Sequence, residues 1–222
     1  MGIISVEKVN HLFWLGRYTQ RVYTTLQRYN TGFDKMLDLD VHFYEKYCEA
    51  LNIPNIYTDY ENFIARYGYD TDNPDSIVSN LYRAYDNALV LREDISSEAL
   101  AYIHLAQFQL KAARISDAPL IELQSVLDNI LAFWGAVDDS IDDYTVRNLI
   151  KLGKKAELLD LKMRFGEKNE ELKRVFGQLD FYLHRVRIEY DKVAYYELAL
   201  AFERGDEIEE KMIHSLEKLI LV

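Results

Sequence analysis

The segment Leu12-Phe13-Trp14-Leu15-Gly16-Arg17-Tyr18 decides the fold class, because it lies in a long helical pattern of a kind that recurs along the chain. Small and apolar residues continue from it at spacings of three, four and seven, the period of a helix with one buried face. Ser5 can cap the start of this helix. We predict a first helix over residues 5–38 with an inward stripe of Leu12, Gly16, Thr19, Tyr23, Leu26 and Phe33.

The same helical period continues to the C-terminus, and the alternation typical of β-strands is nearly absent. Start signals stand at Asn73-Pro74-Asp75, Ser96-Ser97-Glu98 and Ala118-Pro119. Connections are short, and no linker divides the chain. We expect an all-α, single-domain bundle of about eight to ten helices over residues 1–222. The expected helices after the first cover 40–52, 59–67, 73–91, 96–115, 118–134, 145–165 and 169–191, then two more, with Asp206 and Glu209 as a capping box for the last.

Composition narrows the function classes. Apolar residues make up 49% of the 222, and only 9 glycines and 3 prolines occur, which does not suit a loop-rich β protein. A net charge of −11 argues against nucleic acid and anionic membranes as partners. The single cysteine, Cys48, fits a reducing compartment. With no signal peptide and no apolar run near the ~20 residues that span a bilayer, the expected location is cytoplasmic.

The chain contains one weak internal repeat. Leu12–Arg17 resembles Leu149–Lys154 at an offset of 137 residues, and the same offset aligns Gln20 with Glu157. A glycine inside a helix costs about 1 kcal/mol relative to alanine, so two glycines in matching contexts suggest a shared packing reason. The similarity is either chance between two amphipathic helices or a sign that the helices cross closely at Gly16 and Gly153.

Three segments carry a resemblance to a known family. They are Leu12–Tyr18 with Arg21 beyond it, Asn87-Ala88 with Val90–Glu98, and Leu149–Glu157. In this order they resemble the bacterial Alpha-E family of helical proteins over roughly residues 5–165. The resemblance implies a setting of ATP-dependent peptide synthesis or modification, with an ATP-grasp amide ligase or a transglutaminase-like thiol peptidase as partner. It implies no catalytic residue.

The chain departs from the family at both of its acid–arginine pairs. Gln20-Arg21 stands where the first segment of the family has Glu-Arg, and Glu157-Leu158 stands where the third has Glu-Arg. Lys154 replaces an arginine and Leu100 a tryptophan. Each pair therefore keeps only one member, which puts in question any chemistry that needs both.

The candidate binding residues are Arg17, Arg21, Arg92, Glu98 and Glu157. Arg17 and Arg21, with Arg28, share one face of the first helix, where like charges four residues apart repel. Either each arginine meets a carboxylate inside the fold, with Glu157 the candidate partner, or the face binds a carboxylate or phosphate. Arg92 and Glu98 flank a helix start, where they either support capping at Ser96 or join the arginines in one site.

The run from Asp138 to Asp143 is the only candidate for a metal site. Asp138, Asp139 and Asp142 form the pattern D-D-x-x-D, in which carboxylates one turn apart hold Mg²⁺ for a diphosphate. No second acidic motif accompanies it, and a solvated turn before a helix start at Thr145 is the simpler interpretation. The five histidines lack metal-ligand spacing, Cys48 fits packing, and no glycine-rich phosphate loop occurs, so no cofactor is expected.

The sequence thus favours a helical accessory protein of an ATP-grasp system that binds the enzyme or a peptide or carboxylate substrate and is not itself a catalyst. The first alternative is a stand-alone enzyme that uses the arginine–glutamate cluster or Mg²⁺ at Asp138–Asp143. The second is a scaffold whose role is homo-oligomerisation.

Overall fold

The computed structural model describes residues 4–38, 40–205 and 210–221, with the backbone alone for 33–38. Within these ranges the chain forms ten α-helices, which confirms the all-α class. Their bounds are α1 Val6–Asp38, α2 Phe43–Leu51, α3 Tyr60–Tyr67, α4 Ile77–Val90, α5 Ser97–Ile115, α6 Pro119–Asp139, α7 Tyr144–Arg164, α8 Asn169–Leu183, α9 Lys192–Arg204 and α10 Glu210–Leu219. The side chain of Phe33 and the capping box at Asp206 and Glu209 lie outside the described residues.

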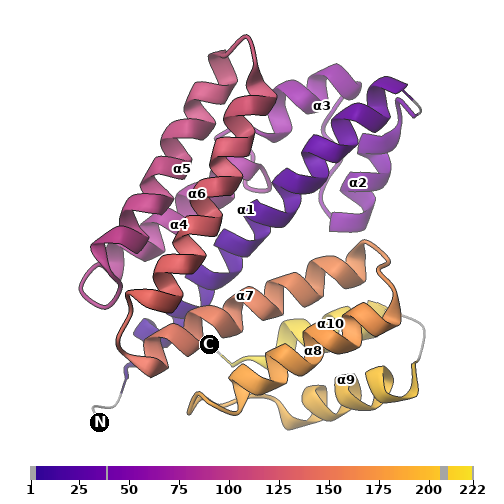
Figure 1. The fold of residues 1–222 in the computed structure, drawn as a ribbon. Coiled ribbons are helices and arrows are strands. Elements are labelled where there is room, and N and C mark those ends of the chain that lie inside the picture. The colour runs from indigo at the N-terminus through magenta and orange to yellow at the C-terminus, as the bar shows by residue number, and fades with distance from the viewer. Residues whose placement is uncertain (1–3, 39, 206–209, 222) are drawn as a thin grey trace.

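Helix α1 is the axis of the fold. Its 33 residues span about 50 Å, and it packs against α4 on one side and α7 on another, while α5 and α6 form an antiparallel pair (Figure 1). The predicted stripe is buried at Leu12, Gly16, Thr19 and Leu26, whereas Tyr23 is half-buried. Ser5 accepts a hydrogen bond from the backbone N–H of Lys8 at 3.2 Å, as a cap should. Helices α7 to α10 form a separate layer below α1.

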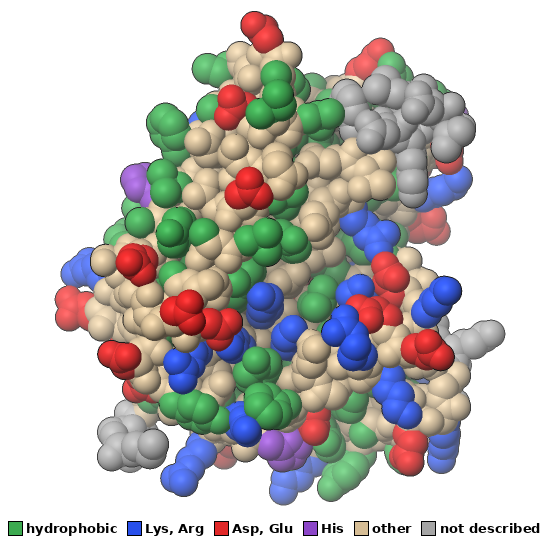
Figure 2. Space-filling view, in the orientation of Figure 1, with side chains coloured by type: hydrophobic (Ala, Val, Ile, Leu, Met, Phe, Trp, Pro, Cys, Tyr) green, Lys and Arg blue, Asp and Glu red, His purple; other side chains and the backbone are tan. Residues whose placement is uncertain are grey.

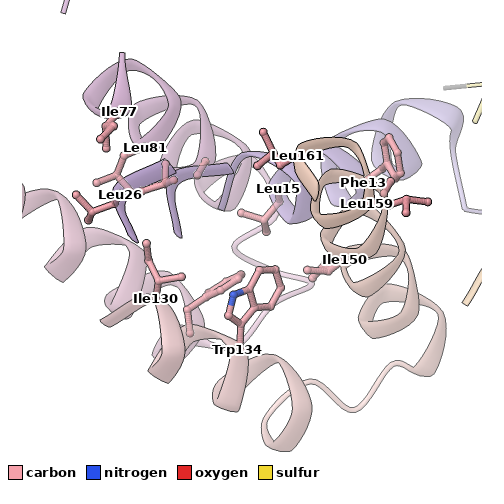
Figure 3. Packing of buried hydrophobic residues seen from close by; sticks show 14 of the residues in the cluster. Phe13, Leu15, Leu26, Ile77, Leu81, Ile130, Trp134, Ile150, Leu159 and Leu161 are labelled. Atoms are coloured by element: carbon pink, nitrogen blue, oxygen red, sulfur yellow. The ribbon is translucent and has the colours of Figure 1, made fainter. Parts of the chain in front are cut away.

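One hydrophobic cluster includes buried residues from all ten helices. Figure 3 shows its centre, where Leu15 of α1, Trp134 of α6 and Ile150 of α7 point into the same space. Cys48 is buried in this cluster, and burial, with the charge of Asp75, raises the pKa of its thiol to about 11. A neutral, enclosed thiol fits packing, as the sequence predicted.

The two glycines of the repeat lie where α1 crosses α7. A Cβ at Gly16 would collide with the carbonyl oxygen of Ile150 and lie 2.9 Å from the amide nitrogen of Lys154. A Cβ at Gly153 would collide with the carbonyl oxygen of Phe13 and lie 3.1 Å from the amide nitrogen of Arg17. The offset of 137 residues converts each set of contacts into the other. The predicted close crossing is confirmed, and the two helices are related by a local pseudo-two-fold axis.

Several predicted boundaries were wrong. The expected helix over 169–191 is two helices, because α8 ends at Leu183 and Asp191 caps α9 by accepting N–H groups from Val193 and Ala194. Helix α4 begins after Ser76, whose hydroxyl accepts the N–H of Ser79, whereas Asn73 holds a turn before it.

Helix α6 continues past Trp134 to Asp139, because Ala136 and Val137 extend its buried face. By length and composition it could cross a membrane, so the statement that no segment approaches that length was wrong. Its described contacts are those of a core helix: Leu123, Ile130 and Phe133 are buried in the cluster.

Candidate functional site

Two of the candidate arginines meet the candidate glutamate at the α1–α7 crossing. Arg17 Nε donates to Glu157 Oε2 at 2.7 Å, and Arg21 Nε donates to Glu157 Oε1 at 2.5 Å. The Glu157 side chain is 1% exposed, against 14% for Arg17 and 26% for Arg21. Because Arg17 and Arg21 follow each other by one helical turn, α1 presents both guanidinium groups to the same carboxylate. One acid from α7 therefore neutralises the repulsion that their spacing creates on α1.

The ion pairs continue beyond Glu157 across three helices. Arg21 Nη2 lies 3.7 Å from Asp160, Asp160 accepts from Arg164 at 3.0 Å, and Arg164 donates to Glu217 of α10 at 2.8 Å. We call Arg17, Arg21, Glu157, Asp160 and Arg164 the ER cluster. Because its charges belong to α1 and α7 and its end contacts α10, the ER cluster ties the lower layer of helices to the axis of the fold.

Burial and charge set the protonation of these groups. Burial acts to raise the pKa of Glu157, but Arg17 and Arg21 reverse this and hold it below its usual range. Burial likewise opposes the charge of Arg21, while Glu157 and Asp160 hold its pKa above the ordinary value. Burial and the neighbouring Glu157 raise the pKa of Asp160. Glu157 therefore stays ionised at neutral pH as the acceptor of two guanidinium groups, which leaves it poorly placed to act as a general base.

Arg28, the third arginine of the α1 face, also has its own acid. It donates to Glu167 at 2.5 Å and lies 4.2 Å from the centre of the Phe165 ring. Arg17 lies 4.9 Å from the centre of the Trp14 ring. The arginines of α1 are thus occupied by internal carboxylates and aromatic faces, which is the structural one of the two interpretations that the sequence allowed.

Arg92 and Glu98 do not join the ER cluster. Arg92 follows α4 with a side chain that is 64% exposed, and its Nε lies 4.0 Å from Glu93. Glu98, in the first turn of α5, accepts the hydroxyl of Ser140 at 2.8 Å. In the described part of the chain neither residue forms an ion pair or hydrogen bond with Arg17, Arg21 or Glu157. Ser96 caps α5 by accepting the N–H of Ala99, so this segment serves the helix start.

The aspartate run is divided between two helix ends. Asp138 and Asp139 lie in the last turn of α6, and Asp138 forms an ion pair with Lys151 of α7. Asp143 caps α7 by accepting the N–H groups of Thr145 and Val146. Among residues 4–38, 40–205 and 210–221, no three His, Cys, Asp or Glu side chains gather as a metal site would require. The arrangement links α6 to α7 and gives no support to Mg²⁺ binding.

Sequence analysis did not single out a lysine cluster beside the crossing. Lys151, Lys154 and Lys155 follow one another on α7, and the ammonium group of Lys154 lies 3.9 Å from the centre of the Trp134 ring. The signal was present in the repeat. The offset of 137 aligns Lys154 with Arg17, and it aligns Gln20 with Glu157.

The comparisons with known proteins identify the chain at the level of family. The model of the Alpha-E family, described as a predicted alpha-helical domain with a conserved ER motif, matches residues 8–185. The chain belongs to the Alpha-E family. Neither the curated proteins nor the solved structures gave a match.

The Alpha-E match extends the resemblance seen from sequence, which ended near residue 165, through α8. Within residues 8–185 this Alpha-E chain has no adjacent Glu-Arg pair. The structure restores one such pair in space, because Arg21 of the first segment meets Glu157 of the third. The pseudo-two-fold axis would place a second pair at positions 20 and 158, where the chain has Gln20 and Leu158.

Proposed function

We propose that this Alpha-E protein is a non-catalytic accessory subunit that docks an ATP-grasp enzyme of peptide or amide synthesis. Two features support the proposal. The family resemblance suggests the setting, and the ER cluster is occupied by internal ion pairs, which favours a structural role for it over acid–base chemistry. The cytoplasmic location predicted from sequence belongs to the same proposal.

The observation that carries the proposal is an exposed apolar surface on the α5–α6 pair. Figure 2 shows hydrophobic side chains gathered over these two helices. We call this surface the hairpin face; its exposed members are Leu105, Phe108, Ile115, Ile121 and Leu131. Contiguous apolar surface of this kind, bordered by charged residues such as Lys111 and Asp128, marks protein interaction sites.

The test is direct binding to the ATP-grasp enzyme of the same cells. The tagged protein is used to capture partners from soluble extract, and an ATP-grasp protein found by mass spectrometry is then purified and titrated against it. Phe108→Asp should weaken that binding by at least roughly tenfold, as loss of an interface anchor does. Tyr196→Asp on α9 is the matched control, because Tyr196 is 63% exposed and Phe108 is 66% exposed.

The outcomes separate the rival functions. Binding that Phe108→Asp weakens and Tyr196→Asp leaves intact supports docking through the hairpin face. If Phe108→Asp instead converts a dimer to a monomer in light scattering, with no ATP-grasp protein bound, the scaffold alternative replaces the proposal. Substitution of Arg17 and Arg21 would be a poor test of docking, because their removal leaves Glu157 buried without a partner.

A further inference from the structure

Three lysines gather on one side of α7 in a protein of strongly negative charge. Lys151, Lys154 and Lys155 are spaced by three and four residues, and basic side chains are seen near the centre of Figure 2, where α7 lies. Lys151 pairs with Asp138. In the described part of the chain, Lys154 and Lys155 form no ion pair with any carboxylate. Positive charges one turn apart repel, so the folded chain holds two cations together without a neutralising group of its own.

The surroundings of the cluster make this arrangement costly for the protein alone. Burial, then the charges of Lys155 and Lys151, lower the pKa of Lys154 to about 7. Burial and Arg174 also lower the pKa of Lys155, against a smaller opposing effect of Glu171. The Trp134 ring beneath Lys154 favours its charged form and offsets part of the loss. An added anion would restore what water and carboxylates provide elsewhere.

The pseudo-two-fold axis shows which group is absent. On one side of the crossing, Glu157 of α7 neutralises Arg17 and Arg21 of α1. On the other side, Lys154 takes the position of Arg17, and Gln20 takes the position of Glu157. Gln20 is buried and its amide nitrogen donates to the hydroxyl of Thr24 at 2.9 Å. The second half of the ER cluster therefore keeps a cation and lacks its anion.

We propose that Lys154 and Lys155, with Lys151 beside them, bind the phosphate group of a small molecule. Lysine acts on phosphate as a point charge, so three ammonium groups can surround a tetrahedral anion without the planar fork that carboxylate binding favours. A phosphate monoester carries about −1.5 to −2 charges at pH 7, which matches the two cations that lack partners. The net charge of −11 repels extended polyanions and anionic bilayers, which favours a small ligand.

The site is separate from the hairpin face, so the inference goes beyond the proposed function and each can fail alone. Calorimetric titration with inorganic phosphate, with glycerol phosphate and with phosphatidic-acid vesicles tests it at low ionic strength. The first two probes should bind, with an affinity that falls as salt rises. The double variant Lys154→Gln/Lys155→Gln should lose roughly 10–100-fold in affinity, since each charged hydrogen bond is worth about 1.5–3 kcal/mol.

The matched control is Lys111→Gln. Lys111 of α5 also lies over an aromatic ring, 5.6 Å from the centre of Tyr82, so its loss should leave phosphate binding unchanged. Binding to vesicles alone, equal weakening by Lys111→Gln, or no binding of phosphate at millimolar concentration would overturn the proposal.

A second variant tests the geometry without removing a lysine. Gln20→Glu places a carboxylate where the pseudo-symmetry requires one, so it should compete with phosphate and weaken binding to the extent that the double variant does. Thermal unfolding of each variant shows that the fold is retained. If Gln20→Glu folds and binds phosphate as the wild type does, the external anion does not take the place of the internal one, and the inference fails.

Discussion

Replacing either crossing glycine by alanine should strongly destabilise the protein. At Gly16 the new methyl group would collide with the carbonyl oxygen of Ile150 and lie 2.9 Å from the amide nitrogen of Lys154. Both are backbone atoms, so no side chain can move aside to make room. Helices α1 and α7 would have to separate by about 1 Å, and a closely packed interior loses contact energy over such a gap.

The magnitude follows from two opposing effects. Overpacking of a core typically costs 1–3 kcal/mol, and a collision with backbone at the central helix pair places this change at about 3–5 kcal/mol. Alanine returns about 1 kcal/mol through its better helix propensity. The net loss is about 2–4 kcal/mol, which corresponds to a fall in Tm of roughly 4–16 °C for a chain of this length.

Urea unfolding and thermal melts of Gly16→Ala and Gly153→Ala provide the measurement. The controls are Gly135→Ala in α6 and Gly177→Ala in α8, where an added Cβ meets nothing within 4 Å. These should stabilise by up to about 1 kcal/mol through propensity alone. If Gly16→Ala were as stable as Gly135→Ala, the close crossing would be refuted, and with it the pseudo-symmetry argued from it.

Three further predictions concern the charges beside the crossing. Glu157→Gln should cost about 3–5 kcal/mol in urea unfolding because it leaves buried guanidinium groups unpaired, whereas Glu167→Gln, at a half-exposed pair, should cost less than about 1 kcal/mol. The stability contribution of Lys154 is fully present above its unfolded pKa of 10.5 and lost as pH falls through 7, so Lys154→Met should be more stable than wild type at pH 6, with an advantage that shrinks steadily towards pH 10. Gln20→Glu should raise the pKa of Lys154, as measured by NMR of methylated lysines; an unchanged value would show that residue 20 does not face this lysine.

Local sequence signals predicted the helices wherever a cap and a buried stripe agreed. Ser5 and Ser96 cap α1 and α5 as expected. At Asn73 the signal was misread, because asparagine before proline supports a turn as well as a helix start, and Ser76 provides the cap. The helix over 169–191 was overextended because residues 184–191 keep apolar spacing while their backbone turns towards α9.

The ER cluster was only partly predictable. The departures at Gln20 and Leu158 showed that Arg21 and Glu157 each lacked a neighbour in sequence, and the repeat suggested that their helices cross. Arg92 and Glu98 were grouped with them on resemblance alone, and the structure places their contacts at Glu93 and Ser140 instead. Asp160 and Arg164 were missed because only the packing of α7 shows that an acid and an arginine one turn apart both face α1 and α10.

The crossing also has a consequence for how the chain is made. Gly153 follows Gly16 by 137 residues, so the ribosome synthesises α1 long before the helix that covers it. At 5–20 residues per second the interval is roughly 7–27 seconds. During this time Arg17 and Arg21 have no Glu157 to neutralise them, and the contact face of α1 is open to solvent. Because the last contact to form holds the layers together, a truncated chain ending before α7 would leave that face to be protected by a chaperone.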